Sequence, residues 1–151
     1  MIYLDSSFLI ELVEDPGPWG AAADGALAEL PDEVFAVTPL VLMECLVGPL
    51  KQNDFDLEDA YRQAIAGLQM IPLDQPVFER AARLRAAANV KTPEAIHWAA
   101  AKLGGCTALW TADGRLAKAA AGFAVDKFAG LRGEQTRVGG SLTPQPEQDP
   151  E

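Results

Sequence analysis

Four acidic residues stand where a carboxylate could do chemistry rather than solubilise the surface. Asp5 directly follows the apolar run "MIYL", and Asp113 follows the run "ALWTA". Glu44 lies inside the apolar segment "PLVLMECLV", and Glu94 lies in "KTPEAIHWAAA" beside His97, the only histidine of the chain. A buried carboxylate costs several kcal/mol unless it is paired, protonated or coordinated. These four positions are therefore the candidates for a catalytic or metal-binding site.

Each of these residues also has a purely structural interpretation. An aspartate at the end of a strand often caps the following helix, and Glu44 could face outward between buried neighbours. A glutamate in the first helical turn interacts favourably with the helix macrodipole, by ~0.3–1 kcal/mol. A single histidine on a half-apolar face is more often a hydrogen-bonded structural residue than a ligand. The Glu-x-x-His spacing of residues 94 and 97 also occurs in di-iron bundle proteins, but those need two copies and this chain has one.

Short apolar runs alternate with helical stretches along the chain. Ser6 or Ser7 is expected to cap the first helix, and Thr-Pro pairs at 38–39 and 92–93 mark two helix starts. Gly48 is expected to end the helix that contains Glu44. We expect strands at 1–4, 34–37, 69–73, 107–111 and 123–128, and helices at 6–13, 19–30, 38–48, 56–68, 75–89, 92–103 and 114–121.

Short strands separated by helices predict a parallel sheet with helices on both faces. Ligands of such sheets bind beyond the carboxyl ends of the strands, where Asp5 and Asp113 fall. Residues 133–151 are poor in apolar side chains and rich in Pro, Gly and Gln. We therefore expect a single domain over residues 1–132 and a disordered acidic tail over 133–151.

The formal net charge of −10 is unevenly distributed. Residues 1–73 hold 13 of the 22 acidic residues but two of the 12 basic ones, whereas residues 74–132 have a surplus of bases. Overall acidity disfavours non-specific binding to nucleic acid. The local surplus still allows one basic surface. The candidates for phosphate contacts are the bases nearest the acidic motifs, Arg85, Lys91, Arg115 and Lys118, although each could equally be a solvated charge on a helix face.

Other features of the composition indicate a cytoplasmic protein. No apolar run approaches the ~20 residues of a membrane span, and the first residues do not resemble a secretory signal. Two cysteines do not form a disulfide framework in a chain of 151 residues. Cys45 lies in an apolar segment and is expected to be a buried thiol.

The segments "MIYLDSSFLIEL", "KTPEAIHWAAAKLGG" and "LWTADGRLAKAA", with a lone glutamate in the helix after the second strand, together resemble a PIN domain. The similarity is greatest to the VapC type, the toxin half of bacterial toxin–antitoxin pairs, and covers roughly residues 1–128. It implies a three-layer α/β/α sandwich around a five-stranded parallel sheet in the order 3-2-1-4-5. It also implies a metal-dependent endoribonuclease that hydrolyses RNA phosphodiester bonds.

The resemblance assigns roles to particular residues. Asp5, Glu44, Glu94 and Asp113 match the family's acidic, catalytic quartet, with Asp5, Glu94 and Asp113 as expected metal ligands. Ser6 and Thr111 match small hydroxyl positions that line the same pocket, and Arg115 is the nearby cation for the substrate. His97 falls where these toxins often have a histidine. Two departures are Glu94, where the family usually has Asp, and Gly114, where a second base is common.

Four converging carboxylates require a counter-charge. At about 5 Å and an effective dielectric constant of 20, each pair would repel by roughly 3 kcal/mol. A site built from carboxylate oxygens suits Mg²⁺ or Mn²⁺ rather than zinc. The resemblance further implies a cognate antitoxin, a transfer or ribosomal RNA substrate, and a homodimer. Trp19 or Trp98 could contribute to an interface or to the core, with the core favoured for Trp98.

Two alternatives remain open from the sequence. A PIN-like domain that has lost catalysis could act as an RNA-binding or assembly scaffold, although all four acidic positions are filled. A phospho-receiver domain would share the parallel sheet, but it needs two acids after the first strand and a phosphoacceptor after the third. The chain has one acid in "LDSS" and only Asp74 in "QMIPLDQP".

Overall fold

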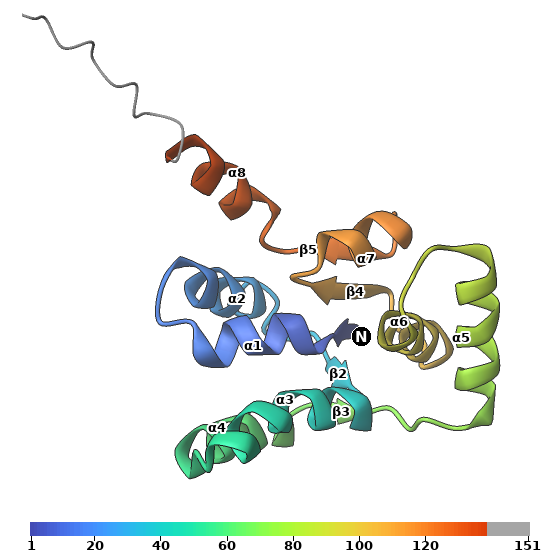
Figure 1. Cartoon of the computed structure of the whole chain (residues 1–151), viewed down its shortest axis with the longest axis horizontal. Helices are drawn as coiled ribbons and strands as arrows, with labels where there is room; N and C mark the ends of the chain where they lie inside the picture. The colour runs from blue at the N-terminus through green and yellow to red at the C-terminus, as the bar shows by residue number, and fades with distance from the viewer. Residues whose placement is uncertain (139–151) are drawn as a thin grey trace, which may run out of the picture.

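Five short strands form the centre of the computed structural model, which describes residues 1–138 (Figure 1). They are β1 (Ile2–Leu4), β2 (Phe35–Val37), β3 (Gln69–Met70), β4 (Ala108–Thr111) and β5 (Ala124–Asp126). Their order is β3-β2-β1-β4-β5, and every neighbouring pair is parallel. The expected parallel sheet and its strand order are confirmed.

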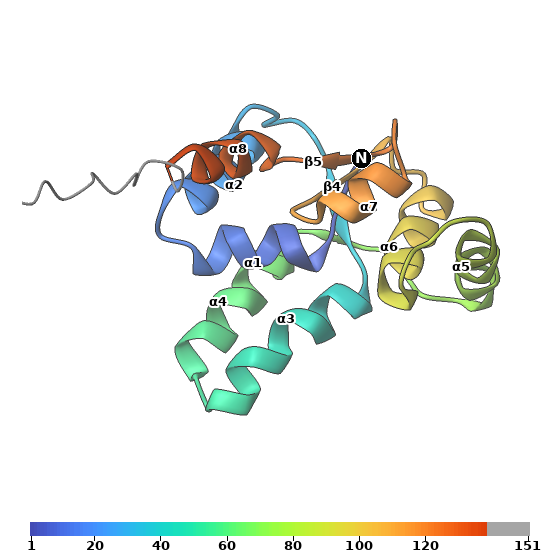
Figure 2. The same cartoon turned by 45° about the horizontal axis from the view of Figure 1, so that its top comes forward.

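Helices cover both faces of this sheet. One layer contains α1 (Ser6–Glu14), α2 (Pro18–Ala28), α3 (Pro39–Gln52) and α4 (Phe55–Ala66). Figures 1 and 2 show α5 (Gln75–Ala87) and α6 (Thr92–Leu103) on the other side, with α7 (Gly114–Ala119) above them. Right-handed crossovers explain this division, because the chain runs outward from β1 to β3 and then returns past β1 to β4 and β5.

Burial follows from the layering. All three residues of β1 are buried, as expected for a strand with neighbours on both sides and helices on both faces. Its register pairs Leu4 with Trp110 of β4. The residues that follow these two strands therefore emerge at the same edge of the sheet.

The N-cap of α1 and the end of α3 differ from those expected. Asp5, rather than Ser6 or Ser7, caps α1, and its side chain accepts the Phe8 N–H. Helix α3 begins after Thr38 as expected but continues past Gly48 to Gln52. Its C-cap is Asn53, whose φ of 52° supplies the left-handed conformation that ends a helix.

The last described helix, α8 (Ala129–Val138), was not expected. Residues 133–138 belong to it, so they are helical where we expected the start of a disordered tail, and residues 139–151 lie outside the described part. Aromatic contacts connect α2 to the segment before α8: the rings of Trp19 and Phe128 stack with centroids 5.2 Å apart. Trp98 is half-buried and packs against the core, in line with the interpretation favoured for it.

No helix within residues 1–138 combines the length and the apolar character that crossing a lipid bilayer requires.

Candidate active site

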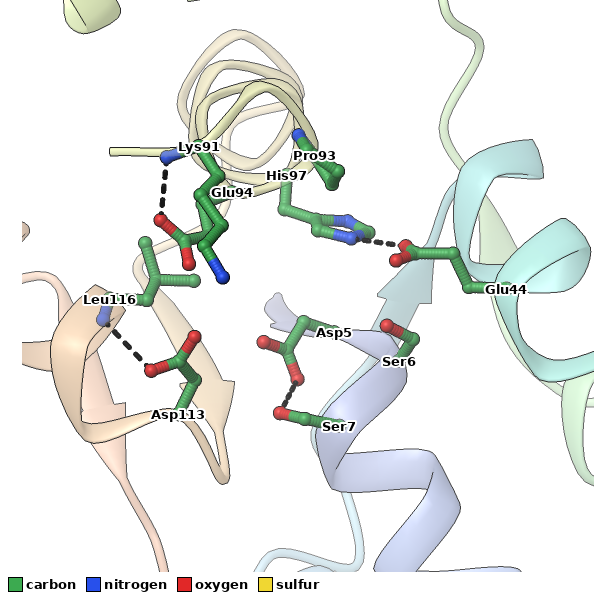
Figure 3. Close-up of a pocket in the computed structure, with 10 residues that line it drawn as sticks. All are labelled: Asp5, Ser6, Ser7, Glu44, Lys91, Pro93, Glu94, His97, Asp113 and Leu116. Carbon is green, nitrogen blue, oxygen red and sulfur yellow. Dashed lines mark hydrogen bonds and ion pairs between the residues drawn. The ribbon is translucent and has the colours of Figure 1, made fainter. Parts of the chain in front are cut away.

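The four acidic residues singled out from the sequence line one pocket of about 200 Å³ (Figure 3). Asp5 follows β1, Glu44 comes from α3, Glu94 from α6, and Asp113 follows β4. The pocket thus lies at the carboxyl ends of two neighbouring parallel strands, where open α/β sheets bind ligands. Its complete lining is Asp5, Ser6, Ser7, Glu44, Lys91, Pro93, Glu94, His97, Asp113 and Leu116.

Asp5 is the most deeply buried of the four acids, with 4% of its surface exposed. One carboxylate oxygen accepts hydrogen bonds from the Ser7 hydroxyl (2.7 Å) and the Phe8 N–H (3.0 Å). The other accepts the Thr111 hydroxyl at 2.6 Å. Burial raises the pKa of Asp5, although nearby His97 and these hydrogen bonds act in the opposite direction. The fold therefore holds this carboxylate in a fixed position and leaves its charge under-compensated.

The small hydroxyl residues divide into two groups. Ser6 lines the pocket as expected. Thr111 is fully buried and is absent from the lining; it supports Asp5 from behind instead of facing a ligand. Ser7, which was expected only as a possible helix cap, lines the pocket and ties the two strand ends together by accepting the Ala112 N–H at 2.9 Å.

Asp113 caps a helix and also lines the pocket. It is the N-cap of α7, and one carboxylate oxygen accepts the N–H groups of Arg115 (2.8 Å) and Leu116 (3.4 Å). Its own N–H donates to the Thr111 hydroxyl at 2.8 Å, which links it to the residue that holds Asp5. The structural interpretation of Asp113 as a helix cap and its interpretation as a member of the acidic site therefore both apply.

Glu94 also has two roles. One of its carboxylate oxygens accepts the backbone N–H of Lys91 at 2.7 Å, which satisfies an unpaired donor at the start of α6. The N-cap of α6 is Lys91, one residue before the Thr92 that the Thr-Pro pair suggested. Glu94 is 9% exposed and faces the pocket, so it is both a helix-start acid and part of the acidic cluster.

Glu44 lines the pocket with 28% of its side chain exposed, and a chain of hydrogen bonds that runs into the core sets its orientation. Its carboxylate is 2.6 Å from Nε2 of His97, and Nδ1 of His97 is 2.8 Å from the Tyr3 hydroxyl. The Tyr3 hydroxyl in turn lies 2.9 Å from the hydroxyl of Thr38, the residue that precedes α3. Figure 3 shows His97 directed at Glu44 across the pocket.

Only the bond to Glu44 has a fixed direction. The Glu44 carboxylate accepts, so Nε2 of His97 donates. Burial raises the pKa of Tyr3 well above its ordinary value, so its hydroxyl keeps its proton and can donate it either to Nδ1 of His97 or to the Thr38 hydroxyl. His97 is thus the hydrogen-bonded structural histidine of the plainer interpretation, and it acts on a member of the acidic cluster.

Two cations near the cluster differ from expectation. Arg115 is not part of the pocket lining. Lys91 is, and Figure 3 shows its side chain directed into the space between Glu94, Asp113 and Asp5. The sequence placed Lys91 among the four bases nearest the acidic motifs but did not distinguish it from the other three.

The chemistry of the pocket suits a divalent cation, although its side chains are engaged with protein partners. Among residues 1–138, no group of three or more His, Cys, Asp or Glu side chains is close enough to hold a metal ion as the side chains lie. The carboxylates of Glu44 and Glu94 are turned toward His97 and the Lys91 N–H. The donor set of four carboxylates, of which Asp5 and Glu94 are buried, still fits Mg²⁺ or Mn²⁺, which prefer oxygen ligands.

The receiver-domain alternative finds no support. Asp74, its only possible phosphoacceptor, precedes α5 and lines a separate hollow with Ile71 and Gly104. It does not join the pocket that contains Asp5.

Comparison with known proteins agrees with this geometry. A search of curated protein sequences found no match. A toxin–antitoxin complex from Klebsiella pneumoniae is similar in structure, with 28% sequence identity, a TM-score of 0.69, and coverage of 84% of this chain and 98% of that chain. VapC20 of Mycobacterium tuberculosis, described as a toxin that cleaves the sarcin–ricin loop, shows 18% identity and a TM-score of 0.67 over 83% of this chain and 98% of its own. VapBC2 of Rickettsia felis, bound to a promoter DNA fragment, shows 14% identity and a TM-score of 0.70 over 83% and 98% of the two chains.

The family comparison matches the PIN domain over residues 2–122, which contain all four acidic residues of the pocket. The strand order and the convergence of Asp5, Glu44, Glu94 and Asp113 were established independently of that match. The chain belongs to the PIN domain family.

Proposed function

We propose that this protein is a metal-dependent endoribonuclease and the toxin of a type II toxin–antitoxin system. The observation that carries the proposal is the gathering of four carboxylates from four separate elements in one pocket of a PIN domain. The similarity to a toxin–antitoxin complex from K. pneumoniae supports the biological role, and the similarity to an RNA-cleaving VapC toxin supports the substrate class.

Asp5, Glu94 and Asp113 are the side chains that would hold Mg²⁺ or Mn²⁺. Asp5 is fixed by its three hydrogen bonds, and Asp113 is fixed as the cap of α7. Each would offer an oxygen to the ion without losing its structural contacts. A bound divalent ion polarises the phosphodiester, lowers the pKa of a bound water and stabilises the charge on the leaving oxygen.

Glu44 would orient the attacking water and accept its proton. His97 occupies one Glu44 oxygen at 2.6 Å, which leaves the carboxylate fixed in direction and its second oxygen for the water. Ser6 would contact the substrate from the start of α1, and Lys91 would contact the phosphate that is cut. Hydrolysis would form a bond between the water oxygen and phosphorus and break the bond from phosphorus to the leaving sugar oxygen, which would take up a proton from solvent.

The proposed partners are RNA, a cognate antitoxin and a second copy of the chain. Because transfer and ribosomal RNA are found in the cytoplasm, the reaction would take place there. Helices α3 and α4 expose apolar side chains that a protein partner would cover, led by Phe55 at 75%, Met43 at 56% and Leu50 at 55%. The acidic charge of the chain favours a basic partner segment.

The test joins metal binding to RNA cleavage. Calorimetry should show Mn²⁺ binding by the wild type that is lost in Asp5→Asn and in Glu94→Gln. Cleavage of total transfer and ribosomal RNA should require the metal and stop with EDTA. Wild-type protein that neither binds the metal nor cleaves RNA would instead indicate the alternative function, a catalytically inactive PIN-like RNA-binding or assembly scaffold.

A further inference from the structure

A second hollow, of opposite charge, lies beside the acidic pocket. Its volume is about 470 Å³, and its lining is Ala88, Asn89, Arg115, Lys118 and Ala119. We propose that this basic hollow binds a backbone phosphate of the RNA strand being cut, on one side of the scissile bond. The inference rests on the proposed function and adds to it the path that the substrate takes.

The two cavities adjoin because the same two parts of the chain form both. The segment between α5 and α6 supplies Asn89 to the basic hollow and Lys91 to the acidic pocket. Helix α7 supplies Arg115 to the hollow and Leu116 to the pocket. A strand whose phosphate lies at the acids, where Figure 3 shows the Lys91 side chain, can therefore continue directly into the hollow.

The charges of the basic hollow are available to a ligand. Arg115 and Lys118 are exposed, and their side chains form no hydrogen bond or ion pair with the described part of the chain. The lining contains no acidic residue, although the whole chain carries a net charge of −10. A guanidinium, an ammonium and an amide around one concavity match the oxygens of a phosphate and its ribose.

The rim of the hollow is held in place by Arg85. Its Nε donates to the carbonyl oxygen of Val90 at 3.3 Å, and its Nη1 donates to the Thr92 hydroxyl at 2.9 Å. These bonds fix the segment that carries Asn89 and Lys91, which lowers the cost of ordering it when the strand binds. Arg85 thus supports the rim through two of its three guanidinium nitrogens.

The experiment measures binding of RNA separately from its cleavage. Full-length Asp5→Asn protein in EDTA is titrated against a short fluorescein-labelled single-stranded RNA at several salt concentrations, with anisotropy as the readout. The test variant adds Arg115→Gln and Lys118→Gln. The matched control adds Arg80→Gln and Arg83→Gln, which remove two exposed charges at the same spacing on α5.

The test variant should bind about tenfold more weakly, and the slope of log K against log salt should fall by about 1.4 because two phosphate contacts are lost. The control should stay within about twofold of the parent. An equal loss of RNA affinity in both variants would overturn the inference. The proposed function would be unaffected by that result, because the metal-binding and cleavage assays test it separately. Displacement of the RNA by polyglutamate as readily as by unlabelled RNA would also overturn it, because it would assign the hollow to an acidic protein.

Discussion

Tyr3→Phe removes one hydroxyl from the centre of the molecule and leaves the aromatic ring that packs there. The side chain is fully buried, and its hydroxyl bridges Nδ1 of His97 at 2.8 Å and the Thr38 hydroxyl at 2.9 Å. Each hydrogen bond contributes about 0.5–1.5 kcal/mol net, and a buried partner left unsatisfied adds to the loss. We expect the free energy of unfolding to fall by about 2 kcal/mol.

Urea unfolding followed by circular dichroism measures this change. In a chain of this size, 2 kcal/mol corresponds to a decrease of about 4–8 °C in Tm. Thr107→Val is the matched control, because its exposed hydroxyl makes a single long bond of 3.3 Å to the Met1 carbonyl. The control should change stability by less than about 0.5 kcal/mol.

A double-mutant cycle tests whether the chain of hydrogen bonds acts as a unit. Thr38→Val removes the next hydroxyl with little change in shape, and we expect a coupling energy with Tyr3→Phe of about 0.5–3 kcal/mol. A Tyr3→Phe protein as stable as the wild type, or changes that simply add, would refute the inferred importance of the chain of hydrogen bonds that orients Glu44.

Four further predictions concern stability, catalysis and reactivity. Gly20→Ala places a Cβ 1.9 Å from the Asp15 carbonyl oxygen, so it should lower the free energy of unfolding by about 3 kcal/mol or more. Gly25→Ala in the same helix meets no atom and should raise the free energy of unfolding by about 0.5–1 kcal/mol. Urea unfolding measures both changes. Asp113→Asn should keep the α7 cap and lose RNA cleavage. Asp113→Ala should lose cleavage and also about 1 kcal/mol of stability, because it removes the cap. RNA cleavage by the Asp113→Asn protein would refute the metal-ligand role. Burial raises the folded-state pKa of Asp5, so the ionised carboxylate destabilises the fold at neutral pH. In EDTA, Asp5→Asn should therefore be more stable than the wild type near pH 7, with an advantage that shrinks as the pH falls through the raised pKa; a difference independent of pH would contradict this. Burial raises the pKa of Cys45 to about 12, so a thiol reagent at pH 8 should leave it unmodified in the native protein and label it after unfolding.

The sequence predicted the parallel sheet and the meeting of two of its aspartates, because each follows from one local pattern. Alternating apolar runs and helices imply a parallel sheet, and residues after parallel strands share an edge, so Asp5 and Asp113 were expected to meet. The resemblance to the PIN domain added the strand order and brought Glu44 and Glu94 to the same place, and the structure confirms that order.

Tertiary partners were beyond such reasoning. Tyr3 is indistinguishable from a core aromatic in "MIYL", and its contact with His97 spans 94 residues. The end of α3 was misplaced because Gly48 has no need for a left-handed conformation there, whereas Asn53 adopts it. Thr111 was expected to line the pocket because the resemblance to the PIN domain places a small hydroxyl residue there, but the direction of its side chain into the core depends on packing.

The position of β1 in the middle of the sheet has a consequence for synthesis. The first strand is made at once, yet its neighbour β4 lies at Ala108–Thr111, and the bond from Thr111 to Asp5 joins residues 106 positions apart. A ribosome must therefore release nearly the whole PIN domain before the acidic pocket can exist. Fragments from translation interrupted before β4 contain Asp5, Glu44 and Glu94 but lack Asp113 and the Thr111 hydroxyl that holds Asp5, so they cannot form the complete acidic pocket.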